Sequence, residues 1–171
     1  MPRSPRIGEC VAAGLLALAV SVALPSGGQG AAGQAKGTLS HKGKSVTLAH
    51  AYLVTGPDAV DTKRTIRRLI LTTKDLGAKI RGCQAMSCSD GEVTEGLVVD
   101  IGAGPRLNYW MALNDQKVQH SGTQPPASLR ASADDPKRLA GKLSFDDSGA
   151  SGPKVDVEFD AALVKDFKAA R

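Results

Sequence analysis

Hydrophobic and polar residues alternate along much of the chain, with the two-residue period of β-strands rather than the longer period of a helix. The stretches with this pattern are Ser45–Val54, Arg64–Thr72, Gly96–Ile101, Arg106–Leu113, Arg138–Phe145 and Lys154–Asp160. In the second stretch, the segment Leu69–Leu71 is apolar on both faces. The other stretches keep one polar face, which predicts antiparallel sheet with one side in water.

Two pairs of these stretches predict hairpins. A short turn through Asn114–Gln116 pairs Met111 with His120, and it places both Val118 and His120 on the apolar face. The second hairpin surrounds the Gly- and Ser-rich segment Asp146–Pro153. The residues predicted to face inward are Val46, Leu48, His50, Tyr52 and Val54 in the first stretch, Leu97, Val99, Ile101, Leu107, Tyr109, Met111 and Leu113 in the middle, and Leu139, Leu143, Phe145, Val155, Val157 and Phe159 at the end.

Helical spacing occurs in two short places only. Lys74–Ile80 predicts a turn or two of helix, and the tail Ala161–Ala170 places Leu163 and Phe167 on one helical stripe. The Pro-rich connection Gly122–Lys137 has room for one short strand. We therefore predict an all-β fold, an antiparallel β-sandwich or small barrel of roughly seven to nine short strands with at most one or two short helices.

The first 35 residues have the order of a secretory signal peptide. Arg3 and Arg6 precede the apolar run Val11–Leu24, and a small-residue segment follows in which we expect cleavage between residues 28 and 35. The run is too short for a permanent membrane anchor, and the remaining chain has no longer one. The sequence thus predicts a single β-domain over residues 36–171, located in the periplasm or secreted, with no transmembrane segment.

Cys83 and Cys88 lie five positions apart, and the loss of Cys10 with the signal peptide would leave them as a pair. Because an exported protein meets an oxidising environment, we expect a disulfide, which stabilises the fold by about 2 kcal/mol in the loop-entropy model. Met86 lies between the two cysteines. Thiolate and thioether are ligands that Cu(I) prefers, so a metal role for this loop is kept as an alternative.

Charge is uneven along the predicted domain. Residues 36–82 hold ten basic and three acidic residues, whereas residues 83–171 hold ten basic and thirteen acidic ones. The basic excess is greatest around Lys63, Arg64, Arg67 and Arg68, a cluster suited either to a solvated strand face or to an acidic partner. With three Phe, two Tyr and one Trp, the chain has few rings for base stacking, so we do not expect nucleic-acid binding.

Metal ligands and catalytic groups are sparse. His41 lies in a Lys- and Gly-rich turn and is expected to be in water, while His50 and His120 both fall on predicted core faces. They could meet there and bind copper or zinc together with Met111, although hydrogen-bonded core histidines are commoner. No serine nucleophile elbow, calcium loop or phosphate loop is present. We accordingly expect neither a cofactor nor catalysis.

Trp110 is the aromatic residue with the most unusual position. The alternation that buries Tyr109 and Met111 directs Trp110 to the opposite face of its strand. An outward Trp is either covered by a second layer or part of a binding patch. With Arg64, Arg67, Arg68 and Met86, Trp110 completes the predicted binding surface.

The segments Gly37–Val54 and Gly141–Phe167, at the two ends of the predicted domain, resemble a family of small exported bacterial β-proteins. The middle of the chain, including the cysteine loop, does not share the resemblance, and no catalytic motif comes with it. It implies an exported β-protein and carries no function over.

The predicted function is non-catalytic binding of a protein or an envelope component, as in a small inhibitor or immunity-type protein. Such a protein needs a rigid scaffold and a projecting segment but no reactive groups. The alternative is a periplasmic copper- or zinc-binding protein that uses His50, His120 and Met111, or the Cys83–Cys88 loop.

Overall fold

The computed structural model describes residues 33–113 and 118–171. The predicted signal peptide therefore lies outside the described residues, apart from its last three positions, which begin the first strand. The strands are β1 (Gly33–His41), β2 (Lys44–Pro57), β3 (Thr65–Thr72), β4 (Gly96–Ile101), β5 (Leu107–Ala112), β6 (His120–Gln124), β7 (Leu129–Asp135), β8 (Arg138–Asp146) and β9 (Lys154–Asp166). Two short helices, α1 (Gly77–Gly82) and α2 (Met86–Gly91), follow β3, and 3-10 turns lie at Pro126–Ser128 and Ser148–Ala150.

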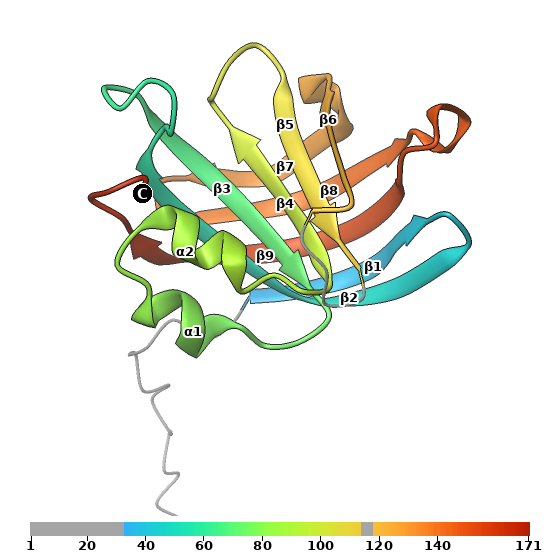
Figure 1. Ribbon diagram of the computed structural model, residues 1–171, viewed down its shortest axis with the longest axis horizontal. Coiled ribbons are helices and arrows are strands. Elements are labelled where there is room, and N and C mark those ends of the chain that lie inside the picture. The colour runs from blue at the N-terminus through green and yellow to red at the C-terminus, as the bar shows by residue number, and fades with distance from the viewer. Residues whose placement is uncertain (1–32, 114–117) are drawn as a thin grey trace, which may run out of the picture.

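These strands form one sheet in the order β6-β5-β4-β3-β2-β1-β9-β8-β7. The sheet curls into a half-barrel, with β7, β8 and β9 behind β3, β4 and β5 in Figure 1. Near its end, β2 also pairs in parallel with β9, where Leu53 lies opposite Leu163. The predicted all-β class is confirmed, and a single curled sheet takes the place of two separate layers.

The main core fills the concave side of the half-barrel. In the hairpin β8–β9, Leu143 pairs with Val157 and Phe145 with Val155, as the alternation predicted. The buried residues of the main core are Leu39, Leu48, Ala51, Leu53, Leu69, Leu71, Leu97, Val99, Leu107, Tyr109, Met111, Leu113, Leu139, Leu143, Val155, Val157, Phe159 and Ala161. Hydrophobic residues two apart on successive strands thus drive the curl, because facing strands bury the same surface.

A second core lies on the convex side, under the two helices. Its buried members are Tyr52, Val54, Ile66, Ile70, Leu76, Ile80, Cys83, Met86, Val93, Val98 and Phe167. This layer explains why Leu69–Leu71 is apolar throughout: Leu69 and Leu71 face the main core, and Ile70 faces the helices. Figure 1 shows α1 and α2 beside the sheet, in front of β2 and β3.

The tyrosine hydroxyl of Tyr52 fixes the start of α1. It accepts a hydrogen bond from the backbone N–H of Leu76 at 2.7 Å and donates one to Asp75 Oδ1 at 2.7 Å. The same Asp75 oxygen accepts the N–H of Gly77 at 2.8 Å. Burial, assisted by the Asp75 carboxylate, raises the pKa of Tyr52 to about 12, so the hydroxyl keeps its proton.

The predicted inward face of β2 is wrong for the second half of the strand. The pairing of β1 with β2 shifts register between Gln34 and Gly37, and the inward face of β2 changes there. Val46 and Leu48 face the main core, whereas Tyr52 and Val54 face the helix layer. A one-residue irregularity reverses every later side chain, which the alternation alone does not reveal.

Two further predictions about local structure are wrong. The tail does not form a helix, because β9 continues to Asp166 and sends Leu163 and Phe167 to different cores. The β5–β6 register does pair Met111 with His120, yet Val118 is 53% exposed instead of buried. The predicted turn residues of this hairpin lie outside the described residues.

Neither helix in the described part of the chain has the length and apolar content that a membrane crossing requires.

Candidate functional site

A cleft of about 370 Å³ opens at one end of the sheet, between the β2–β3 loop (residues 58–64) and the β4–β5 loop (residues 102–106). Figure 1 shows the β2–β3 loop projecting beyond the sheet at the upper left. The cleft is lined by Asp58, Ala59, Val60, Asp61, Arg64, Arg68, Asp100, Ala103 and Asn108. Its walls combine both signs of charge with small apolar side chains.

Hydrogen bonds hold the projecting loop in one conformation. Asp58, which is 7% exposed, accepts the N–H of Val60 on Oδ1 at 2.7 Å. The backbone N–H of Asp58 donates to Arg64 O, and that of Arg64 donates to Asp61 O, both at 2.9 Å. Arg64 Nη1 then donates to Ala103 O at 2.6 Å, which joins the two loops. The loop is therefore preorganised by its own polar groups.

Val60 stands at the tip of this loop with 94% of its surface exposed. Val60 and Val118 are the large hydrophobic residues that are exposed within the described part of the chain. Holding an apolar side chain in water has no benefit for the fold, since burial is what makes such a residue stabilising. Because its hydrogen bonds fix the loop, Val60 is held in one position where a partner could reach it.

A buried ion network forms the floor of the cleft. Arg68 is 7% exposed and donates to both carboxylate oxygens of Asp100, from Nε at 2.6 Å and from Nη2 at 2.9 Å. Its Nη1 donates to Asp90 Oδ1 of α2 at 2.5 Å. Burial raises the pKa of Asp90 to about 6, because desolvation and the negative charge of the nearby Asp100 carboxylate outweigh the attraction of Arg68. The network ties α2 to the sheet beneath the cleft.

No family model, curated protein or solved structure matches the chain. The function is therefore inferred from the geometry of the described residues themselves.

The residues of the predicted binding surface separate in the structure. Arg64 and Arg68 line the cleft. Arg67 points to the other face of β3, where it forms an ion pair with Asp134 of β7. Trp110 is half-buried and packs against the convex core. The cleft therefore brings together Arg64 and Arg68, whereas Arg67 lies on the opposite face of the sheet and Trp110 does not line the cleft.

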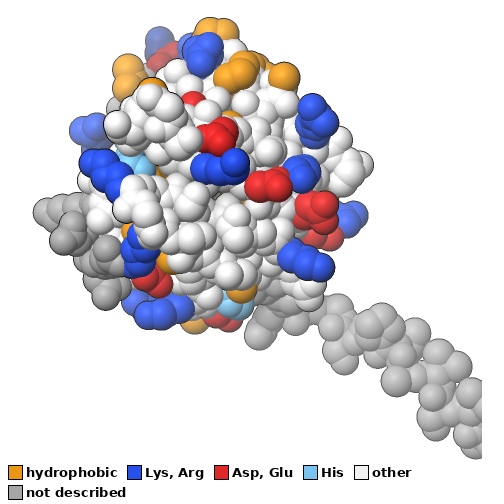
Figure 2. Space-filling view, turned by 90° about the vertical axis from the view of Figure 1, so that its right-hand side faces the viewer, with side chains coloured by type: hydrophobic (Ala, Val, Ile, Leu, Met, Phe, Trp, Pro, Cys, Tyr) orange, Lys and Arg blue, Asp and Glu red, His pale blue; other side chains and the backbone are white. Residues whose placement is uncertain are grey.

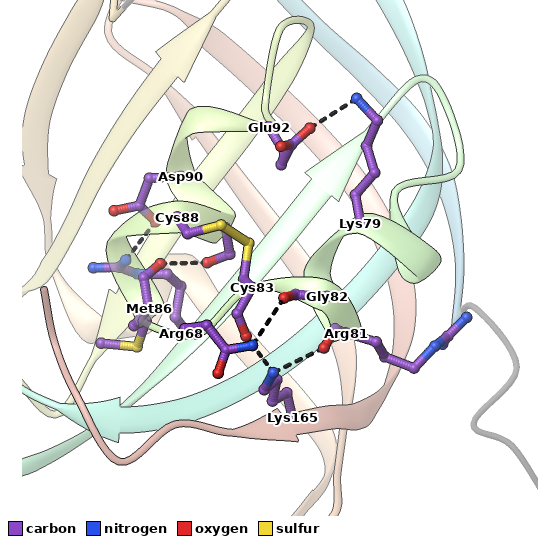
Figure 3. Close-up of a disulfide and its surroundings, with 12 residues drawn as sticks. Arg68, Lys79, Arg81, Gly82, Cys83, Met86, Cys88, Asp90, Glu92 and Lys165 are labelled. Atoms are coloured by element: carbon purple, nitrogen blue, oxygen red, sulfur yellow. Dashed lines mark hydrogen bonds and ion pairs between the residues drawn. A yellow bond between two sulfur atoms is a disulfide. The ribbon is translucent and has the colours of Figure 1, made fainter.

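The cysteine segment does not project from the molecule. Cys83 and Cys88 are joined by the expected disulfide, with their Cα atoms 5.5 Å apart. Figure 3 shows the bridge between α1 and α2, with Lys165 of β9 donating to Arg81 O at 2.8 Å. Met86 is 1% exposed, so it belongs to the core and is left out of the proposed surface.

The chain end covers this segment as well. The backbone N–H of Met86 donates to Ala169 O and that of Ser87 to Ala170 O, both at 3.0 Å. Phe167 packs in the convex core beside them. The stapled segment is accordingly a cover for the outer face of the sheet, held from both sides.

The alternative in which His50 and His120 meet is not supported by their positions in the structure. His50 lies on the convex face, with its ring stacked on Tyr52 at 6.4 Å between centroids, whereas His120 pairs with Met111 of the concave core. The expectation that His41 lies in water is wrong, because it is 8% exposed. Within the described residues, no group of three or more His, Cys, Asp or Glu side chains is placed to hold a metal ion.

Sequence reasoning missed Val60 and the cleft. The only signal was a valine between Asp58 and Asp61, in a segment whose polar residues mark a turn. A lone apolar residue in a turn is common, so its exposure became informative only once the loop was seen to project.

Figure 2 shows the face of the molecule that lies on the right-hand side of Figure 1. On this face, basic and acidic side chains are interspersed, without a large patch of one sign.

Proposed function

We propose that the protein is an exported, non-catalytic binding domain that contacts a partner protein through the β2–β3 loop and the adjoining cleft. The observation that carries this proposal is the 94% exposure of Val60 on a loop fixed by internal hydrogen bonds. Such a loop loses little conformational freedom on binding, so its contacts convert efficiently into affinity.

The chemistry of the cleft supports the same interpretation. Val60 supplies an apolar anchor, while Arg64, Asp61 and Asn108 at the rim supply hydrogen-bonding groups around it. An apolar centre with a polar surround is the usual composition of a protein–protein contact. The partner surface is expected to offer an apolar pocket for the valine.

The location belongs to the proposal too. A signal peptide in the first residues would deliver the domain to the periplasm or the exterior, where the Cys83–Cys88 disulfide is stable. In that compartment, a small rigid domain with a preorganised loop fits an inhibitor- or immunity-like role toward a protein or an envelope component.

The test is affinity capture from an envelope extract with the wild-type chain, Val60→Asp and Val118→Asp. Val118 provides a matched control because it is also an exposed valine but lies on the β5–β6 connection. We expect a protein captured by the wild type and by Val118→Asp and lost with Val60→Asp, while all three melt at the same temperature. Equal capture by all three chains, or none above a blank resin, contradicts the proposal.

A further inference from the structure

Two histidines that are far apart in sequence lie against each other on the concave side of the half-barrel. His41 is the last residue of β1, and His120 is the first residue of β6. Their ring centroids are 5.5 Å apart, with the planes tilted by 50°. Neither ring has a role in the cleft or in the proposed contact loop.

The backbone holds His41 firmly in place. The β1–β2 turn has positive φ at both central residues, 47° at Lys42 and 79° at Gly43, which is typical of a type I′ hairpin turn. His41 pairs directly with Lys44 across this turn. Its Nδ1 atom is buried and has no hydrogen-bond partner within the described part of the chain. A buried polar atom without a partner is costly, so a group that coordinates it gains that energy.

His120 is surrounded by fixed neighbours on its other side. The Tyr109 ring stacks on it at 6.0 Å, and the Tyr109 hydroxyl donates to Asp147 Oδ2 at 2.7 Å. Gln124 Nε2 donates to the same oxygen at 2.5 Å. Burial and the nearby carboxylate raise the pKa of Tyr109, so it remains a donor to Asp147.

Gly152 leaves room beside His120. A Cβ atom at this position would lie 2.6 Å from Asp147 Cβ and 3.2 Å from His120 Nε2. Any larger residue would therefore press on the imidazole edge. The glycine therefore lies against the Nε2 edge of the His120 ring.

The separation of the two rings fits a shared metal ion. A metal–nitrogen bond of about 2.0–2.1 Å and an imidazole radius of about 1.2 Å place the centroids of two ligating rings roughly 5–6.5 Å apart. The observed 5.5 Å falls in this range. Neutral imidazole is a preferred ligand of Zn²⁺ and Cu²⁺, and water can complete the coordination of an open site.

We propose that His41 and His120 form a two-histidine site for a divalent late first-row transition metal ion, either Zn²⁺ or Cu²⁺. The site is independent of the partner-binding loop, since it lies on different strands and uses different side chains. By joining β1 to β6, the ion would bridge strands that do not pair in the sheet.

The test uses isothermal titration with ZnCl₂ and, separately, CuSO₄ on the untagged chain. All samples carry Cys10→Ser, because Cys10 is the cysteine outside the disulfide. His120→Ala is the main variant, since this ring is only half-buried, and His50→Ala is the matched control on the opposite face of the sheet. Melting curves without metal verify that each variant is folded.

We expect one ion per chain, an affinity lowered about tenfold or more by His120→Ala, and no change with His50→Ala. Imidazole nitrogen NMR signals of His41 and His120 should shift on adding Zn²⁺, whereas those of His50 should not. His41→Ala should abolish the same binding if this variant folds. If it does not fold, the NMR shift of His41 in the wild-type chain on adding Zn²⁺ tests whether His41 is a ligand. Absence of binding by both ions, or equal weakening by His120→Ala and His50→Ala, overturns the proposal.

Discussion

The Asp90 carboxylate offers the sharpest test of the buried ion network, through the substitution Asp90→Asn. Arg68 already donates from Nε and Nη2 to Asp100, so Asp90 receives one hydrogen bond from it and bears the desolvation of its own charge. Its side chain is 29% exposed. The raised pKa of about 6 means that the Asp90 carboxyl binds a proton more tightly in the folded state than in the unfolded chain.

The sign of the pH effect follows from linkage. In the unfolded chain Asp90 has its ordinary pKa near 3.8, so between pH 6 and pH 4 the folded state binds more protons at this group than the unfolded state. The free energy of unfolding therefore gains a contribution as the pH falls. With a folded pKa of about 6, the gain between pH 7.5 and pH 5 is about 1–1.5 kcal/mol.

The assay is urea unfolding of the wild type and Asp90→Asn at several pH values from 7.5 to 5. Titrating groups that do not interact with Asp90, including the histidines, act equally in both proteins and cancel in the difference. We expect the wild type to gain about 1–1.5 kcal/mol relative to the variant as the pH falls. A difference that stays constant, or moves in favour of the variant, would show that Arg68 stabilises the charged carboxylate and would refute this reasoning.

Two further predictions concern the disulfide and the chain start. Cys83→Ser/Cys88→Ser should lower the free energy of unfolding by about 2 kcal/mol in urea titration, while capture of a partner through Val60 persists. If the double variant folds but captures no partner, the segment between the two cysteines belongs to the binding surface after all. The chain recovered from the envelope fraction should begin at or before Gly33, because β1 starts there and Ala35 packs against the concave core; mass spectrometry showing a start at Lys36 or later would contradict this.

Much of the fold was predictable because its cause is local. In β4, β5, β8 and β9, inward residues two apart face the concave core as their alternation indicates, since the pleat sends successive side chains to opposite faces. The β8–β9 hairpin register followed from the same rule. The disulfide was predictable from two nearby cysteines in a chain with a signal-like start.

Long-range pairing decided what local pattern could not. The tail has helical spacing, yet its Leu163 lies opposite Leu53 and extends β9, because hydrogen bonds to a distant strand outweigh a weak local preference. In β2, the register shift moved Tyr52 to the helix side and separated His50 from His120. Neither effect leaves a mark in the residues concerned.

Local pattern was enough to predict most of the strands and most of their inward faces, since these depend on neighbours along the chain, but it did not indicate β1 at Gly33–His41. Which side chains meet depends on the packing of distant strands: Arg68 meets Asp90 and Asp100, and His41 meets His120. Strand order and sheet curvature create those contacts. The exposure of Val60 has the same origin, because a side chain is left in water only by the packing of everything around it.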